Sequence, residues 1–234
     1  MIKVGLVLTL IGGVLLLAGP LGSRSGLWPF TIGLLMLATS VLLALVGVSL
    51  SLVGGIKTGQ WAVAGAGIVL GLAVVSVPGT FILSARGAPP IHDITTDPDN
   101  PPTFVAILPR RAGAVNPPEY AGSEAAAQQR RAYPDIQPLV LSGTTADVFD
   151  RTLAVVQDLG WDLVAGDRDA GRIEAVDTTF WFGFKDDVVI RIGPAASDRR
   201  VRVDVRSKSR VGVGDVGTNA RRVRTLLARL QSPS

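Results

Sequence analysis

The stretch VRVDVRSKSRVGVGDVGTNARRVRTLLARLQ (Val201–Gln231) carries a strand pattern, a glycine-bearing turn and a helix pattern in one run. Valine alternates with Arg and Asp over Val201–Arg206, which predicts a half-buried strand with one solvated face. Beyond the VGVGDVG turn, apolar residues recur at helical spacing over Ala220–Leu230, which predicts a helix at about Val216–Gln231. The chain is therefore expected to end with a strand and a helix that covers its apolar face.

A helix and three further strands precede this run. Thr144, with Asp147 three residues later, resembles a capping box with Asp in place of Glu, and Gly160 ends the helix that follows. The strand-like segments, separated by short turns, are Trp161–Ala165, Arg172–Phe182, Asp187–Ile192 and Arg199–Ser209. Because short links make neighbouring strands antiparallel, residues 139–234 are expected to form an α+β two-layer domain. Its order is helix, four-stranded antiparallel sheet, helix.

Residues 87–138 are rich in proline, which interrupts long helices and central strands. We expect this segment to be irregular. One short strand is expected at Thr103–Leu108, and one short surface helix is expected at Gly122–Arg131, which is rich in helix formers.

Residues 1–86 contain three apolar stretches, at Val4–Leu21, Thr31–Gly54 and Ala62–Leu83. Each approaches or exceeds the roughly 20 helical residues that cross a bilayer core of about 30 Å. Gly67 and Gly71 form a G-x-x-x-G pattern, which permits close approach of a neighbouring helix. The sequence therefore predicts a membrane domain with three transmembrane helices.

The excess positive charge of the chain belongs to this membrane part. Residues 1–86 hold Lys3, Arg24, Lys57 and Arg86 and no acid, whereas Lys and Arg equal the acids in number over the rest. A neutral soluble part argues against nucleic acid as a partner. The chain has no Cys, which excludes disulfides, thiolate zinc sites and cysteine nucleophiles.

Charge leaves the membrane orientation open. Three spans put the termini on opposite sides, and the positive-inside count is a tie because Lys3 and Lys57 share one side and Arg24 and Arg86 the other. A cleaved signal peptide at Met1–Gly22 is the alternative to the first span. It is disfavoured because no small-residue cleavage site there is free of a nearby proline.

Four strings resemble the bacterial and plastid family catalogued as domain of unknown function fourteen ninety-nine. They are IHDITTD (Ile91–Asp97), YPDI (Tyr133–Ile136), DDVVIRI (Asp186–Ile192) and VDVRSKSRVGVGDVGTNARRV (Val203–Val223). The resemblance covers about residues 88–231 and implies no activity, since the family has none established. Its plant members are associated with the thylakoid lumen and its bacterial members often follow membrane spans. The resemblance therefore implies a multi-pass protein of the bacterial inner (plasma) membrane with a periplasmic C-terminal domain.

The last string also supplies the main candidate ligand-binding residues. Four residues apart on a strand, Arg206 and Arg210 are expected to share a face, with the nearby serines on the other face. Asp215 is the expected N-cap of the last helix. Free helix amides and guanidinium groups would then form a cradle for phosphate, carboxylate or a lipid headgroup. The candidates are Arg206, Ser207, Ser209, Arg210, Asp215, Asn219 and Arg222.

A structural role for these residues is the alternative. The two strand arginines would then pair with acids, and Asn219 would satisfy loop backbone. Candidate acids are Asp186, Asp187 and Asp215.

The basic helix face beside a membrane anchor would also suit anionic lipid. Alternation in the aromatic run Phe180–Phe184 predicts three core phenylalanines, with Trp181 facing a groove or the bilayer.

His92, Asp93 and Asp97 form a second cluster. Asp97-Pro-Asp99-Asn100 lacks the glycine and the closing Glu of a calcium loop, so no metal is expected. As the only histidine, His92 is the sole unperturbed acid–base candidate near neutral pH. A hydrolase using His92 and Asp93 would need a serine nucleophile, and no nucleophile-elbow string surrounds Ser207 or Ser209.

We therefore expect a non-catalytic, membrane-anchored envelope protein that acts as a periplasmic binding or scaffolding module without a cofactor. Its expected partners are membrane lipids and an anionic small molecule or an envelope protein. The alternatives are the hydrolase and an accessory subunit of a membrane complex. The spans carry no buried charged residue, which argues against an ion path of their own.

Overall fold

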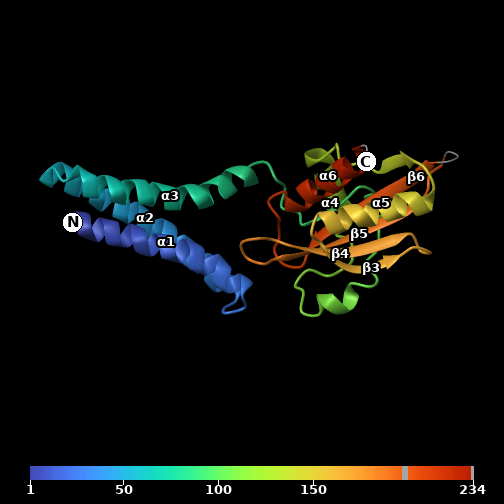
Figure 1. The fold of residues 1–234 in the computed structure, drawn as a ribbon, viewed down its shortest axis with the longest axis horizontal. Coiled ribbons are helices and arrows are strands. Elements are labelled where there is room, and N and C mark those ends of the chain that lie inside the picture. The colour runs from blue at the N-terminus through green and yellow to red at the C-terminus, as the bar shows by residue number, and fades with distance from the viewer. Residues whose placement is uncertain (197–199, 233–234) are drawn as a thin grey trace. The chain divides into compact units, whose positions relative to one another are not determined.

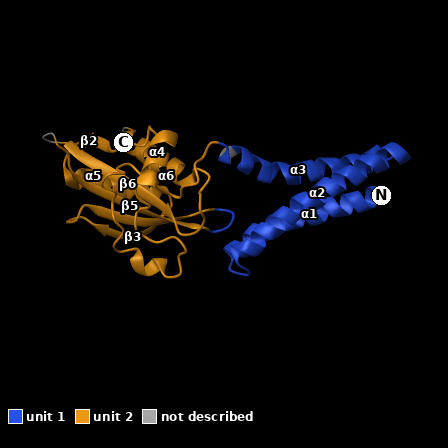
Figure 2. Cartoon of the chain, turned by 180° about the vertical axis from the view of Figure 1, so that it is seen from behind, with its two compact units in different colours: residues 1–86, 180–183 blue, residues 87–179, 184–234 orange. Residues whose placement is uncertain are grey.

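The computed structural model describes residues 1–196 and 200–232 (Figure 1). The chain divides into two compact units, residues 1–86 with 180–183 and residues 87–179 with 184–234 (Figure 2). The first unit holds α1 (Ile2–Arg24), α2 (Phe30–Thr58) and α3 (Trp61–Ala85). The elements that follow are β1 (Asp93–Thr95), η1 (Leu108–Arg111), α4 (Ser123–Ala132), β2 (Leu139–Ser142), α5 (Thr145–Asp158), β3 (Asp162–Asp167), β4 (Arg172–Thr178), β5 (Lys185–Pro194), β6 (Arg200–Ser209) and α6 (Thr218–Gln231).

Helices α1, α2 and α3 are each long and apolar enough to cross a membrane, as the sequence predicts. Each helix includes one expected span and extends a few residues beyond it. The G-x-x-x-G pattern of α3 lies where this helix packs closely against α2. A Cβ atom added to Gly67 would collide with Ser51, and one added to Gly71 would collide with Val48. Small residues are therefore required on this face of α3.

The second unit is built on a six-stranded antiparallel sheet, not the expected four-stranded one. The strand order is β1-β6-β5-β4-β3, and β2 also pairs with β6. β1 pairs with Arg206–Lys208 and β2 with Arg200–Val203, so two short strands share one edge of β6. Strands of three and four residues are too short to show an alternating pattern, which is why sequence reasoning misses both. Arg199, the first residue of the expected last strand, lies outside the described residues.

Helices α5 and α6 pack on one face of the sheet, as expected. The predicted capping box is present: the Thr144 hydroxyl accepts from the Asp147 amide at 3.1 Å, and the Asp147 carboxylate accepts from the Thr144 amide at 3.4 Å. The valine side of β6 joins the main core with the apolar stripe of α6. The side chains that β6 and α6 contribute to this core include Val201, Val203, Val205, Ala220, Val223, Leu226 and Leu230.

The opposite face of β6 is buried from Asp204 to Lys208, so the solvated face expected for β6 is wrong over these residues, and only Arg202 nearer the start of the strand stays partly exposed on this face among the described residues 202–208. Arg206 on this face is 2% exposed, and Asp204 and Lys208 are buried as well. The cause is the part of the proline-rich segment at about residues 102–119, which lies over this face and adds a cover to the two expected layers. A second small core beneath the cover consists of Phe104, Ile107, Val176 and Val189.

A buried carboxylate explains why no strand forms at Thr103–Leu108. The backbone amides of Val105, Ala106 and Ile107 donate to the two carboxylate oxygens of Glu174, at 2.9 to 3.1 Å. These amides are therefore not available to a neighbouring strand. The short helix expected in the proline-rich segment is present as α4.

Candidate functional site

The first group of candidate residues lies under the proline-rich cover. The Arg206 guanidinium forms a bidentate ion pair with Asp93, with Nε–Oδ1 and Nη2–Oδ2 distances of 2.9 and 2.8 Å. It also donates to the carbonyl oxygens of Pro102 and Pro118 and stacks on the Phe104 ring. The guanidinium of Arg206 is therefore occupied by groups of the protein itself.

Three more cations lie at the same face. Lys208 Nζ lies 3.0 Å from Asp93 Oδ2 and 2.6 Å from the carbonyl oxygen of Glu119. Burial lowers the pKa of Lys208, although Asp93 opposes this shift. Arg210 pairs with the buried Asp187, with an Nη2–Oδ1 distance of 2.7 Å, and Arg111 binds the same carboxylate. Two carboxylates thus serve four cations here.

The second group lies on the helix face of the sheet, at the start of α6. Arg222 pairs with Asp186 at 2.6 Å and with Asp177 at 2.8 Å. Its Nη1 also donates to Ser207 Oγ at 3.0 Å and to Asn219 Oδ1 at 2.6 Å. Burial raises the pKa of Asp186, and the charge of Arg222 opposes the shift. The result is a closed buried network.

The remaining members complete this network. Asn219 Nδ2 donates to Ser209 Oγ at 2.9 Å and to the carbonyl oxygen of His92 at 3.1 Å. Gly217, not Asp215, is the N-cap of α6. Asp215 nevertheless accepts from the backbone amides of Gly217 and Asn219. Helix amides that the sequence suggests are free for an anion are therefore bound by a carboxylate of the chain.

The seven candidates thus form two groups on opposite faces of the sheet, not one cradle. Arg206 and Arg210 do share a face, and the two serines share the other, as the strand geometry requires. Their partners follow the structural alternative: Arg210 pairs with Asp187, and Asn219 bonds loop backbone. The acid that binds Arg206 is Asp93, which lies in the second predicted cluster with His92 and Asp97.

His92, Asp93 and Asp97 do not converge on a common point. His92 Nδ1 lies 3.1 Å from the carbonyl oxygen of Val213, whereas Asp93 points to Arg206 and Lys208. Asp97 Oδ2 accepts from Arg202 at 2.7 Å and from Arg191 at 3.2 Å. Over residues 1–196 and 200–232, no group of three or more His, Cys, Asp or Glu side chains is arranged to hold a metal ion.

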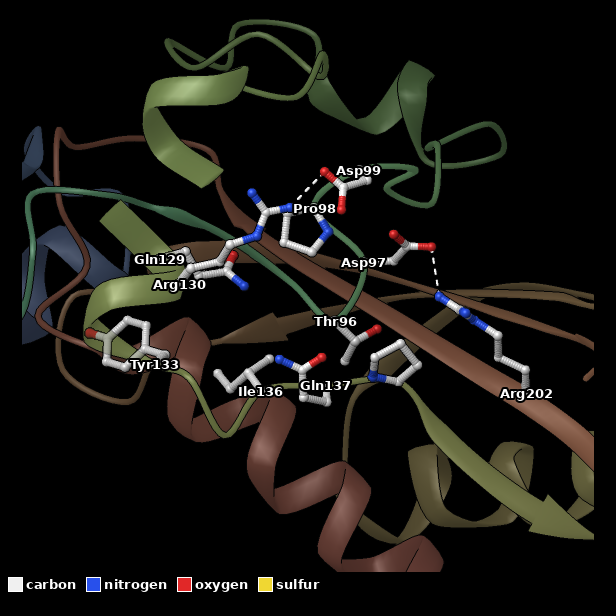
Figure 3. A pocket seen from close by; sticks show the side chains of 11 residues that line it. Thr96, Asp97, Pro98, Asp99, Gln129, Arg130, Tyr133, Ile136, Gln137 and Arg202 are labelled. Atoms are coloured by element: carbon white, nitrogen blue, oxygen red, sulfur yellow. Dashed lines mark hydrogen bonds and ion pairs between the residues drawn. The ribbon is translucent and has the colours of Figure 1, made fainter. Parts of the chain in front are cut away.

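Asp97 instead lines an open pocket of about 410 Å³ (Figure 3). Arg130 reaches toward Asp99 from α4, and Arg202 reaches toward Asp97 from β6 (Figure 3). The two ion pairs lie on separate sides of the pocket. The lining residues are Thr96, Asp97, Pro98, Asp99, Gln129, Arg130, Tyr133, Ile136, Gln137, Pro138 and Arg202.

Buried hydrogen bonds position the walls of this pocket. Gln129 Oε1 accepts from the Thr95 amide at 3.0 Å, and its Nε2 donates to the Thr95 carbonyl oxygen at 2.6 Å. These two bonds fasten α4 to the end of β1. Arg202 Nε lies 3.0 Å from both carboxylate oxygens of Asp204, which fixes the direction of its guanidinium.

Sequence reasoning misses Arg130 and Arg202 because no local pattern joins them. Arg130 ends a helix inside a proline-rich segment, and Arg202 reads as one residue of an alternating strand. The only signal is indirect: the IHDITTD and YPDI strings, distant in the chain, both contribute lining residues.

Comparison with known proteins agrees with the family resemblance of the IHDITTD and YPDI strings. No curated protein and no solved structure gives a match to the chain. One family model does match, that described as protein of unknown function (DUF1499), over residues 93–230. The matched range includes the whole sheet, α4, α5, nearly all of α6 and every residue that lines the pocket. Because the match covers more than half of the sequence, the chain belongs to the DUF1499 family.

Proposed function

We propose that this protein is a membrane-anchored, non-catalytic binding module that holds a small anionic ligand in the pocket between α4 and the end of β1. The observation that carries the proposal is the exposure of two arginine side chains. The side chains of Arg130 and Arg202 in the pocket are 48% and 40% exposed. The side chains of Arg206 and Arg222, by contrast, are buried.

The pocket has the size and chemistry for a small polar molecule. Its volume of about 410 Å³ lies in the range of ligand pockets. The Arg130–Asp99 pair is exposed, and exposed ion pairs contribute only about 0–1 kcal/mol, so a ligand carboxylate or phosphate can replace Asp99 at little cost. Arg202 is held in place by Asp204 and needs little ordering on binding.

The test is calorimetric titration of the full chain in mild detergent with inorganic phosphate and with succinate. We expect at least one probe to bind and Arg130→Gln to weaken that binding about 10-fold or more, because a charge-assisted bond is worth about 1.5–3 kcal/mol. Arg110→Gln is the matched control, since Arg110 forms a similar exposed pair with Asp162 away from the pocket. Equal binding by both variants, or none by the unmodified chain, contradicts the proposal.

We also propose that His92 and Asp93 perform no catalytic step. A hydrolase would need these side chains to meet, whereas Asp93 is held by Arg206 and Lys208 and the His92 ring points to Val213. Replacing His92 by Gln is expected to leave biological activity intact. Lost activity with an unchanged unfolding temperature would favour the hydrolase instead.

We also propose that the soluble domain lies on the periplasmic side of the membrane. This part of the proposal rests on the family's association with extracytoplasmic compartments. The chain has no Cys, so a single cysteine introduced at the exposed Val140 reports its own accessibility. We expect Val140→Cys to react with a membrane-impermeant maleimide when the outer membrane is opened but the inner membrane is intact. Labelling only after inner-membrane lysis would place the domain in the cytoplasm.

A further inference from the structure

Several loops emerge from the same end of the sheet. Asp186 pairs with Ser209, Thr178 with Lys185, and Asp93 with Lys208. This register puts the Thr178–Lys185 end of β4 and β5, the loop from β6 to α6 and the start of β1 at one end. The hairpin is closed at its base, where the Thr179 amide donates to the Phe184 carbonyl oxygen at 2.8 Å.

A further loop is fastened to this end by Asn116. The Asn116 amide donates to the carbonyl oxygen of Arg210 at 2.9 Å. Its side-chain nitrogen donates to the carbonyl oxygens of Ser209 and Gly212, each at 3.0 Å. Val115 is therefore held next to the Val211–Gly214 loop.

The two most exposed apolar side chains of the described residues 87–179, 184–196 and 200–232 both lie at this end. Val213 is 79% exposed and Val115 is 75% exposed. The loop VGVG at 211–214 contains no charged residue. Exposed apolar side chains without charges, gathered at one end, indicate a surface with a partner.

The chain that follows α3 is fixed to the same end. The His92 carbonyl oxygen accepts from the Ser209 amide at 2.9 Å. Pro90 lies so close to Gly214 that an added Cβ on Gly214 would be 3.3 Å from Pro90 Cα. Since α3 ends at Ala85, only residues 86–89 separate a helix that can cross a membrane from a residue fixed to this end. Four extended residues span about 14 Å.

We propose that this end of the domain, formed by Val115 and Val213 with their loops, is a lipid-contact surface. It rests in the headgroup layer of the membrane that α3 crosses. The short tether brings the surface within reach of that layer, and the apolar side chains gain burial there. The proposal is independent of the ligand pocket, because no residue of this surface lines it.

The absence of native cysteine allows a direct test. Single variants Val213→Cys and Val115→Cys of the full chain are labelled with an environment-sensitive fluorophore. The labelled proteins are reconstituted in phosphatidylcholine–phosphatidylglycerol vesicles, with and without lipids that carry a nitroxide near the headgroup. Val140→Cys is the control, because Val140 is 43% exposed and pairs with Arg202, seven residues along β6 from Ser209.

We expect the labels at 213 and 115 to emit at shorter wavelength and to lose most of their emission to the nitroxide lipid, with no such loss at 140. Unchanged unfolding temperatures verify that each variant is folded. Emission at 213 and 115 like that at 140 overturns the proposal. Blue-shifted emission without nitroxide quenching also overturns it, because that result assigns the surface to a protein partner.

Discussion

Asp93 and Arg206, which are 113 residues apart in the sequence, form a bidentate ion pair in which both side chains are almost fully buried. This pair connects the start of the domain to β6. It also explains why an arginine that looks like a ligand-binding residue in the sequence is committed to the fold.

Asp93→Asn should destabilise the domain strongly. The change leaves Arg206 and Lys208 buried without a carboxylate, and removal of one partner of a buried pair costs about 3–5 kcal/mol. Urea unfolding of the full chain in mild detergent, followed by protease resistance, measures the loss. Asp99→Asn is the control, because Asp99 is exposed and its loss should cost less than about 1 kcal/mol. Equal stability of the two variants would show that the buried pair contributes little.

The stability contributed by Lys208 should depend on pH. Asp93 is shared with Arg206, and burial lowers the pKa of Lys208 below 10.5. The unfolded chain then holds more protons than the folded chain between the lowered value and 10.5, so the free energy of unfolding rises with pH in that window. The free energy of unfolding of the unmodified chain, taken relative to that of Lys208→Met, should therefore rise as the pH increases toward 10.5. A constant difference between the two proteins would argue against a lowered pKa.

Glu174→Gln should loosen the proline-rich cover. The carboxylate binds three consecutive amides at 105–107 and the Arg172 guanidinium, and a glutamine has only one oxygen to replace it. We expect faster amide exchange and faster proteolysis within residues 97–120, since a buried unsatisfied donor costs about 1–3 kcal/mol. Glu124→Gln, on an exposed face of α4, should change neither rate.

Gly71→Val should separate the membrane helices. Its side chain would collide with Val48 and meet Thr9 at 2.9 Å, whereas a Cβ on Gly65 of the same helix would meet nothing within 4 Å. Both substitutions change helix propensity equally, so the comparison isolates packing. We expect a lower unfolding temperature in detergent for Gly71→Val than for Gly65→Val. Equal temperatures would mean that this close approach adds no stability.

The sequence predicts the elements that have strong periodic patterns. The three spans, the helix that begins at Thr144 and the strands β3 to β6 all follow from hydrophobic period, turn residues and a cap, although β4 ends at Thr178 and not at the expected Phe182. Short elements are different, because β1 and β2 exist only through pairing with β6. Their formation depends on residues more than 50 positions away, and no local window contains that information.

The error about the face of β6 has the same origin. Alternating Val and Arg predicts a solvated face, and the pattern itself is correct. What the pattern does not contain is the cover, which forms because Glu174 binds amides of a segment with no regular structure. The sequence does not indicate the exposed arginines of the pocket for a related reason, since Arg130 and Arg202 line one pocket only when α4 is fastened to β1.

The short strands β1 and β2, which both pair with one edge of β6, also protect that edge from other molecules. Without residues 87–142, β6 would present a row of unsatisfied backbone donors and acceptors, and such an open edge readily recruits a strand from another molecule. A fragment that begins at residue 139, where the regular pattern begins, would retain β2 and lose β1. Such a fragment should self-associate through the half of β6 that ends at Ser209.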